Sequence, residues 1–257
     1  MIYLENKIED KVGYVLPLGD LHFGDEAFSE RSFKKLKGYI KWVKENPNAR
    51  VVLGGDLFNV ATRISPTSPF EQEKNEFDKV VGLLEPIKSQ IAGAIDGNHE
   101  FRLIDFANYS LMNEFCVRLG IPYMGISGVI NFKVGKKRSK TGGQWQQNYY
   151  IYLHHSTGGG ATAGGKLNRA ERLRYLVEGC DAYLAFHGHS LTATPKEIWF
   201  PNPSSKKVEL RRYWLICCGG YLSWDGSYAE RKMLPPEKLG SPRLRLDGKR
   251  HDIHCSL

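Results

Sequence analysis

Short apolar runs that end abruptly in polar residues recur along the chain. They cover residues 12–18, 51–53, 91–95, 149–153 and 182–186, and their lengths are typical of strands rather than helices. Between the first three runs, apolar residues recur at spacings of three and four, which is the helical period. These positions are Phe33, Leu36, Ile40 and Val43, then Phe77, Val80, Val81 and Leu84. Strands that alternate with helices predict βαβ units and a largely parallel sheet.

Beyond residue 190 the pattern changes to one that consists mostly of strands. Apolar or alternating segments occur at residues 196–200, 207–218 and 242–247. Neither a repeat nor a linker nor a low-complexity segment separates this part from the rest, so we expect a single α/β domain over residues 1–257. A hydrophobic content of 41% and a charged content of 25% agree with a globular fold that has a sizeable core.

Two compositional features limit the class of protein. The first ten residues contain acids where a signal peptide needs an apolar run, and no apolar stretch approaches the ~20 residues that span a bilayer. We therefore expect a cytoplasmic protein with no membrane partner, and the oligomeric state stays open. The five cysteines are odd in number and form no CxxC pair, which indicates neither a disulfide framework nor a thiolate zinc site.

The net charge of +8 suits an anionic partner, either a phosphoester or nucleic acid. Two segments between apolar strands, residues 133–140 and 204–212, are rich in basic residues. Both segments have the pattern of hairpin tips. Charges at such tips either form a solvated edge or contact nucleic acid.

Metal-ligand side chains follow the apolar runs, each at the point where the predicted strand ends. They are Asp20, His22, Asp56, Asn98, His99, His154, His155, His187 and His189. Each of these residues taken singly has an ordinary explanation in a turn or a core. Ligands bind at the carboxyl ends of strands in open α/β sheets, however, and the coincidence at five strand ends predicts a metal site.

The types of side chain also restrict the metal. Carboxylate, amide oxygen and imidazole suit Mn²⁺, which is our first choice, and also Fe, Zn²⁺, Co²⁺ or Ni²⁺. With two divalent ions, Asp20 and Asp56 would neutralise only half of the metal charge, so the site would attract a phosphate. Paired ions of this kind lie about 3.5–4 Å apart and lower the pKa of a bound water to about 7, which makes hydroxide available as a nucleophile.

In their order along the chain, these residues resemble the blocks of the calcineurin-like metallophosphoesterase superfamily. The pattern of that superfamily is D-x-H, G-D-x-x, G-N-H-[DE], a strand-end His and G-H-x-H. All five blocks have counterparts over residues 19–190: Asp20-Leu-His22, Gly55-Asp56, Gly97-Asn98-His99-Glu100, His154-His155 and His187-Gly-His189. The resemblance implies a four-layer α/β/β/α sandwich, with two mixed β-sheets flanked by helices.

The resemblance also implies a role for each matched residue. Asp56 would bridge two metal ions, and a metal-bridging hydroxide would attack phosphorus. The first ion would be held by Asp20, His22 and His189, and the second by Asn98, His187 and the strand-end histidine. For that position we favour His154, which directly follows the apolar run, with His155 as the alternative. His99 would contact the phosphate and protonate the leaving oxygen, and Arg102 either binds a phosphate oxygen or lies on an exposed helix face.

Two positions depart from the family pattern. Phe186 stands where the family usually has Gly, which affects the backbone turn more than the chemistry. Asn59 stands where Ser/Thr protein phosphatases have Asp, and no Arg follows it, which argues against that class. The segment 56–72, together with the glycine-rich loop after His155, looks most like the small phosphoesterases of phages and bacteria.

The resulting prediction is a metal-dependent phosphodiesterase or phosphomonoesterase, and three alternatives stand beside it. A repair-type nuclease shares the G-D-L-F block, and the basic hairpins would then bind the nucleic-acid backbone in a salt-dependent way. A non-catalytic, metal-stabilised binding module would not need His99. Residues 160–166 fit the G-x-x-x-x-G-K core of a P-loop, but Leu167 follows where Ser or Thr would bind Mg²⁺.

Overall fold

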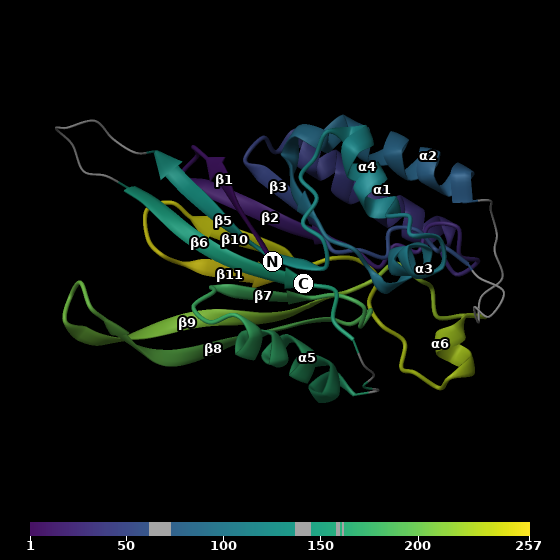
Figure 1. Cartoon of the computed structure of the whole chain (residues 1–257). Coiled ribbons are helices and arrows are strands. Elements are labelled where there is room, and N and C mark those ends of the chain that lie inside the picture. The colour runs from purple at the N-terminus through teal and green to yellow at the C-terminus, as the bar shows by residue number, and fades with distance from the viewer. Residues whose placement is uncertain (62–72, 137–144, 158–159, 161) are drawn as a thin grey trace.

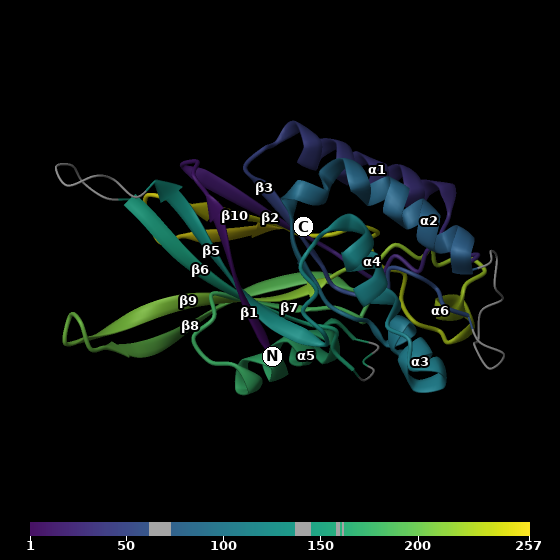
Figure 2. The same ribbon diagram turned by 45° about the horizontal axis from the view of Figure 1, so that its top comes forward.

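The computed structural model describes all residues except 62–72, 137–144, 158–159 and 161. Its strands form two mixed sheets that pack face to face, and helices cover both outer faces (Figure 1). The turned view in Figure 2 shows the same order, with α1, α2 and α4 on one side and α5 on the other. The predicted four-layer α/β/β/α sandwich is confirmed.

The five-stranded sheet has the order β11-β10-β2-β3-β4. Its parallel part is formed by β2 (Val12–Leu18), β3 (Ala49–Leu53) and β4 (Ile91–Ala94). Next to β2 lie the antiparallel strands β10 (Arg243–Asp247) and β11 (Ile253–Ser256). Because β2, β3 and β4 run in the same direction, their carboxyl ends meet at one edge of the sandwich.

The six-stranded sheet has the order β1-β5-β6-β7-β9-β8. Its strands are β1 (Ile2–Ile8), β5 (Ser127–Lys136), β6 (Trp145–His154), β7 (Ala182–Ala185), β8 (Leu191–Asn202) and β9 (Lys207–Cys218). Strands β6, β7 and β9 are parallel, whereas β5 and β8 are antiparallel to their neighbours β6 and β9. The last residues of β6, β7 and β9 therefore also lie at one edge.

The helices attach to the sheets through apolar faces. The five-stranded sheet is covered by α1 (Glu30–Glu45), α2 (Glu73–Leu84) and α4 (Leu111–Leu119), with the 3₁₀ helix η1 (Glu85–Gln90) after α2. In α1, Leu36, Ile40 and Val43 are buried, as their spacing predicts. Helix α5 (Ala163–Leu176) covers the six-stranded sheet, and α3 (Asn98–Ala107) and the short α6 (Tyr228–Arg231) lie near the strand ends.

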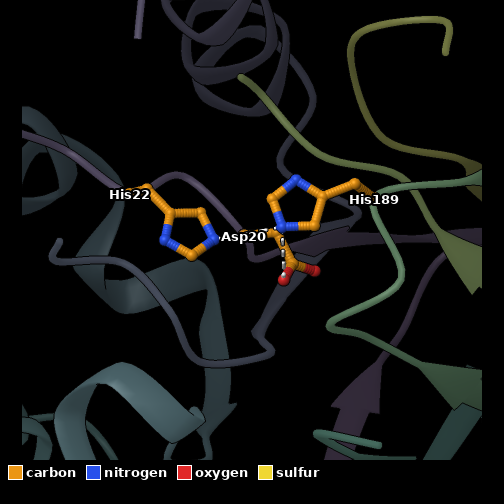
Figure 3. Close-up of side chains that lie close together, drawn as sticks. All are labelled: Asp20, His22 and His189. Carbon is orange, nitrogen blue, oxygen red and sulfur yellow. Dashed lines mark hydrogen bonds and ion pairs between the residues drawn. The ribbon is translucent and has the colours of Figure 1, made fainter. Parts of the chain in front are cut away.

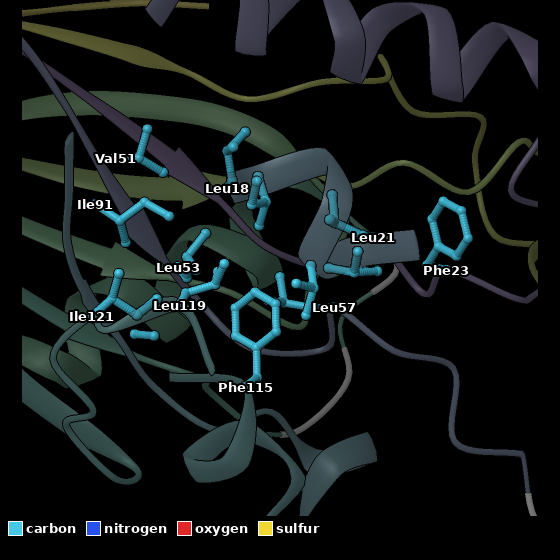
Figure 4. Packing of buried hydrophobic residues seen from close by; sticks show 14 of the residues in the cluster. Leu18, Leu21, Phe23, Val51, Leu53, Leu57, Ile91, Phe115, Leu119 and Ile121 are labelled. Atoms are coloured by element: carbon cyan, nitrogen blue, oxygen red, sulfur yellow. The ribbon is translucent and has the colours of Figure 1, made fainter. Parts of the chain in front are cut away.

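Three apolar layers hold the sandwich together. Leu16, Leu18 and Leu53 pack against the helices on the outer face of their sheet, as Figure 4 shows for part of this layer. Val15 and Val52, which point the other way, pack between the two sheets. Strands that are buried on both faces read as continuous apolar runs rather than as alternating ones, which is why these runs stand out in the sequence.

Several predictions about the elements need correction. The prediction of one largely parallel sheet was wrong, because the parallel strands are divided between two mixed sheets. Strands β1 and β11 were not predicted, since each has a polar or charged outer face. Of the hairpin tip predicted over residues 204–212, only residues 204–206 lie in the β8–β9 connection, and the rest belong to β9. Half of the other basic segment, residues 137–140, lies outside the described residues. In the described part of the chain, no helix is both long and apolar enough to cross a membrane.

Candidate metal centre

The loops that follow β2 and β3 lie side by side and bring two acidic residues together. The backbone N–H of Asp20 donates to the carbonyl of Gly55 at 3.0 Å, and that of His22 donates to the carbonyl of Asp56 at 2.9 Å. These bonds continue the parallel pairing of the strands past their ends. The side chains of Asp20, His22 and Asp56 are buried as a result.

Five of these strand-end residues have a left-handed backbone conformation. The φ angle is 50° at Asp20, 47° at His22, 49° at Asp56, 71° at His187 and 50° at His189. Positive φ is uncommon for residues other than glycine, although Asp and His tolerate it better than most. Such conformations concentrate at functional sites, where the surrounding structure imposes them.

One cluster of ligand-type side chains is formed by Asp20, His22 and His189, whose ligand atoms all lie within 4.8 Å of one another (Figure 3). The Nε2 atoms of His22 and His189 are 3.1 Å apart, and His189 Nε2 lies 3.7 Å from Asp20 Oδ1. Burial lowers the pKa of His189 to about 4 and that of His22 well below its ordinary value. Both imidazoles are therefore neutral near pH 7, as metal ligation requires.

A second cluster is formed by Asp56, His155 and His187. His155 Nε2 lies 3.3 Å from Asp56 Oδ2 and 3.1 Å from Asn98 Oδ1. The Nδ1–H of His155 donates to the carbonyl of Gly54 at 2.7 Å, which directs Nε2 into the cluster. Asp56 Oδ2 is also 3.6 Å from His22 Nε2, so Asp56 lies between the two clusters.

The electrostatics of the acidic residues fit a site for cations. Burial raises the pKa of Asp20 to about 8, because its charge has little compensation. Burial alone would lower the pKa of His155, but the Asp56 carboxylate outweighs it and raises that pKa to about 10. Asp56 Oδ2 is buried and accepts no hydrogen bond from a described residue. Buried carboxylate oxygens that converge with imidazole nitrogens match the ligand set of Mn²⁺, Fe or Zn²⁺, and His155 would give up its proton on binding a cation.

The structure brings His155 into the second cluster, and not His154, which the sequence analysis favoured. His154 is the last residue of β6, and its ring lies 6.3 Å from that of Tyr152. Tyr152 belongs to the layer beneath α5, and residues two apart in a strand share a face. His154 is therefore directed to the outer face of the sheet, whereas His155 follows the strand end and turns towards Asp56.

His99 and Arg102 adjoin both clusters. The backbone N–H of His99 donates to Asp56 Oδ1 at 2.8 Å, and the His99 ring lies 4.4 Å from the His22 ring. Arg102 donates from Nη2 to His99 Nε2 at 2.9 Å and from Nη1 to the carbonyl of Val60 at 3.0 Å. Burial lowers the pKa of His99. Arg102 thus lies within the site rather than on an exposed helix face.

Glu100 is a positioning residue whose role the sequence analysis missed. Its buried carboxylate accepts backbone hydrogen bonds of 2.7–3.2 Å from Asp56, Leu57, Phe58 and Gly97. These bonds join the loop after β3 to the start of α3 and fix the backbone of Asp56. An acidic residue three positions after the residue that precedes a helix is the mark of a capping box, and this signal could have identified Glu100.

Phe186, the residue before His187, is accommodated by two glycines that follow strands of the neighbouring sheet. Its ring is 1% exposed and lies against Gly19 and Gly54. A Cβ atom on Gly54 would lie 2.1 Å from Phe186 Cε1, and one on Gly19 would lie 2.7 Å from Cδ1. The ring thus occupies space that these glycines leave, and the turn before His187 is kept.

Comparisons with known proteins add little to this picture. Neither a family model nor a curated protein matches the chain. Among solved structures, the NAD nucleotidase of Haemophilus influenzae matches with a TM-score of 0.43 and 11% sequence identity. The match covers 96% of this chain and 49% of that one, so this chain spans about half of the length of the nucleotidase. The two ligand clusters are therefore the basis for a functional proposal.

Proposed function

We propose that the protein is a dinuclear metal-dependent phosphoester hydrolase that acts on phosphodiesters or phosphomonoesters. The observation that carries the proposal is the pair of neighbouring ligand clusters with Asp56 between them, and with His99 and Arg102 beside them. One metal would be held by Asp20, His22, His189 and Asp56. The other would be held by Asp56, Asn98, His155 and His187. Mn²⁺ is the first choice because both sets mix oxygen and imidazole ligands.

Bound cations would supply a water of lowered pKa and would stabilise negative charge on the phosphoryl group. The residues of the chain supply the remaining chemistry. The carbonyl of Asn59 accepts a hydrogen bond from His99 Nδ1, which leaves Nε2 directed to the site. A phosphate next to His99 would raise its pKa and favour a proton on Nε2, which His99 would then give to the leaving oxygen. Arg102 donates to Nε2 in this structure, so its guanidinium would have to move from Nε2 to a phosphoryl oxygen before Nε2 carries that proton.

The nuclease alternative has no support from the described basic hairpin. Strand β9 begins at the hairpin with Lys207 and ends next to the site with Cys218. At about 3.3 Å per residue, this places the basic hairpin roughly 35 Å from the strand ends that carry the clusters. Basic side chains at that distance cannot hold a nucleic-acid strand at the ligand clusters.

The proposal is tested with purified protein, Mn²⁺ and three substrates: bis-p-nitrophenyl phosphate, p-nitrophenyl phosphate and single-stranded DNA. We expect hydrolysis that EDTA abolishes. Asp56→Asn should lose turnover and bind both metals more weakly, whereas Asp78→Asn, an exposed carboxylate on α2, should behave as wild type. His99→Asn should keep both metals and lose turnover.

Each other outcome has a definite meaning. Loss of metal in His99→Asn would refute the role given to this residue. Turnover of DNA alone would favour the nuclease. Two bound metals without turnover of any substrate would refute the general hydrolase and favour the binding module.

A further inference from the structure

A cavity of about 640 Å³ adjoins the first ligand cluster. It lies between α5 and the segment that runs through α6, and His187, Gly188 and His189 form part of its wall. Small-molecule sites in proteins have volumes of about 300–1,000 Å³. The cavity is therefore large enough for the organic part of a substrate whose phosphoryl group lies at the clusters.

Arg169 on α5 places a buried positive charge in the wall of this cavity. Its side chain is only 9% exposed, and its Nε and Nη1 atoms have no hydrogen-bond partner among the described residues. One turn earlier on α5, Lys166 is also buried but forms an ion pair with Glu237. A buried guanidinium without a partner is costly, and an anionic ligand would offset that cost.

The position of Arg169 relates it to the ligand clusters. A Cβ atom on Gly188 would lie 2.9 Å from Arg169 Nη1, so the guanidinium packs against the glycine that separates His187 from His189. Any larger residue at position 188 would displace it. The donors of Arg169 are thus held at the boundary between the cavity and the histidines, where a phosphoryl oxygen would be.

The segment around α6 adds apolar and aromatic side chains to the lining of the cavity, beside charged residues such as Lys232. The apolar and aromatic residues include Leu222, Trp224, Tyr228 and Leu234. The indole of Trp224 is fixed, because its Nε1–H donates to the carbonyl of Leu234 at 2.7 Å. Rigid aromatic side chains of this kind favour another aromatic ring as a neighbour.

We propose that this cavity binds the leaving group of a small aromatic phosphoester and that Arg169 binds an oxygen of its phosphoryl group. The proposal rests on the hydrolase function proposed above. It identifies the substrate class as a compact molecule with a planar ring next to the phosphoryl group, and it assigns the ring to the side of Trp224.

The test uses phosphonates, whose C–P bond is not hydrolysed, so that binding is measured apart from turnover. Calorimetric titrations of Mn²⁺-loaded protein with phenylphosphonate and methylphosphonate compare a ligand that has a ring with one that lacks it. We expect phenylphosphonate to bind more tightly, and Trp224→Leu to remove most of that difference. Arg169→Gln should weaken both ligands about tenfold or more, because a charge-assisted hydrogen bond is lost.

Matched variants separate this effect from a loss of charge or of folding. Arg172→Gln removes an exposed charge from the same helix and should bind both ligands like wild type. Arg169→Lys keeps the charge and should bind with intermediate affinity. Thermal unfolding of each variant shows whether it is folded.

The outcomes distinguish this proposal from the proposed hydrolase. Equal affinity for the two phosphonates would overturn the aromatic subsite, and unchanged affinity in a folded Arg169→Gln would overturn the role of Arg169. Either result can occur while wild type still hydrolyses p-nitrophenyl phosphate with Mn²⁺. Absence of hydrolysis of both p-nitrophenyl phosphate and bis-p-nitrophenyl phosphate would instead contradict the hydrolase itself.

Discussion

The contact between Gly54 and Phe186 makes a quantitative prediction about how the two sheets fit together. A methyl group on Gly54 would lie 2.1–2.3 Å from three ring carbons of Phe186. The φ angle of Gly54 is not in the left-handed region, so alanine is compatible with its backbone. Any cost of Gly54→Ala therefore comes from the clash with the ring, and overpacking of this kind costs about 1–3 kcal/mol.

A double-mutant cycle isolates that clash. Phe186→Ala alone should destabilise by about 3–5 kcal/mol, since the ring is buried and a cavity remains. The double variant lacks the clash, so its free energy of unfolding should fall by the same amount as that of Phe186→Ala alone. The coupling between the two changes is then about 1–3 kcal/mol in the direction of mutual compensation.

Urea unfolding of the four proteins in EDTA measures these free energies, with equal slopes as the check that a comparison is valid. Gly82→Ala is the control, because a Cβ atom on this helical glycine meets nothing within 4 Å. It should not couple to Phe186→Ala. Additivity of Gly54→Ala and Phe186→Ala to within about 0.5 kcal/mol would refute the packing argument.

Three further predictions concern the site and its surroundings. His155→Asn should weaken Mn²⁺ binding by roughly tenfold or more, whereas His154→Asn should leave it unchanged in calorimetry; the reverse result would restore His154 as the ligand. Because the pKa of Asp20 is raised to about 8, its carboxyl is protonated at pH 7 in the metal-free protein, and cation binding must displace that proton. The number of protons released when Mn²⁺ binds, measured by calorimetry in two buffers of different ionisation enthalpy, should thus fall by about one between pH 7 and pH 9. A release that stays constant over this range would contradict the raised pKa of Asp20. Replacement of Lys206, Lys207 and Arg211 by Gln should leave both ester and DNA hydrolysis unchanged, and a selective loss on DNA would support the nuclease.

The strand ends could be predicted from sequence because a strand that is buried on both faces is a continuous apolar run. Residues 12–18 are apolar almost throughout and form β2 over the same residues. The polar residues that follow are then placed by topology alone, since parallel strands end at the same edge. This reasoning located Asp20 and Asp56 without any knowledge of loop geometry.

The choice between His154 and His155 failed because it relied on order along the chain and ignored strand alternation. Tyr152 and His154 share a face, and the apolar neighbours Ile151 and Leu153 point between the sheets. Counting by two along β6 would have directed His154 away from the other ligands. One fact was lacking in the pattern, namely which face of β6 packs against the second sheet.

Other features could not be obtained from sequence because they depend on contacts between distant segments. The pairing of Lys166 with Glu237 joins α5 to a loop seventy-one residues away, while Nε and Nη1 of Arg169 have no hydrogen-bond partner in the described part of the chain. The fit of Phe186 against Gly19 and Gly54 likewise requires that the two sheets be stacked. The pattern of residues within one segment does not predict which distant segment it will contact.

The left-handed backbone at the ligand positions limits how the centre can be altered, in evolution or by design. Asp, Asn, His and Gly are the residues that occupy this region most readily, whereas a β-branched residue there is strained, as Val60 is at a φ of 44°. Of these four, all but Gly carry a metal-ligand atom. At Asp20, His22, Asp56, His187 and His189, exchange within this small group preserves the shape of the loop while it changes the charge and hardness of the ligands. A change of metal preference is therefore open to single substitutions, whereas conversion of the centre to an apolar core would require the loops themselves to be rebuilt.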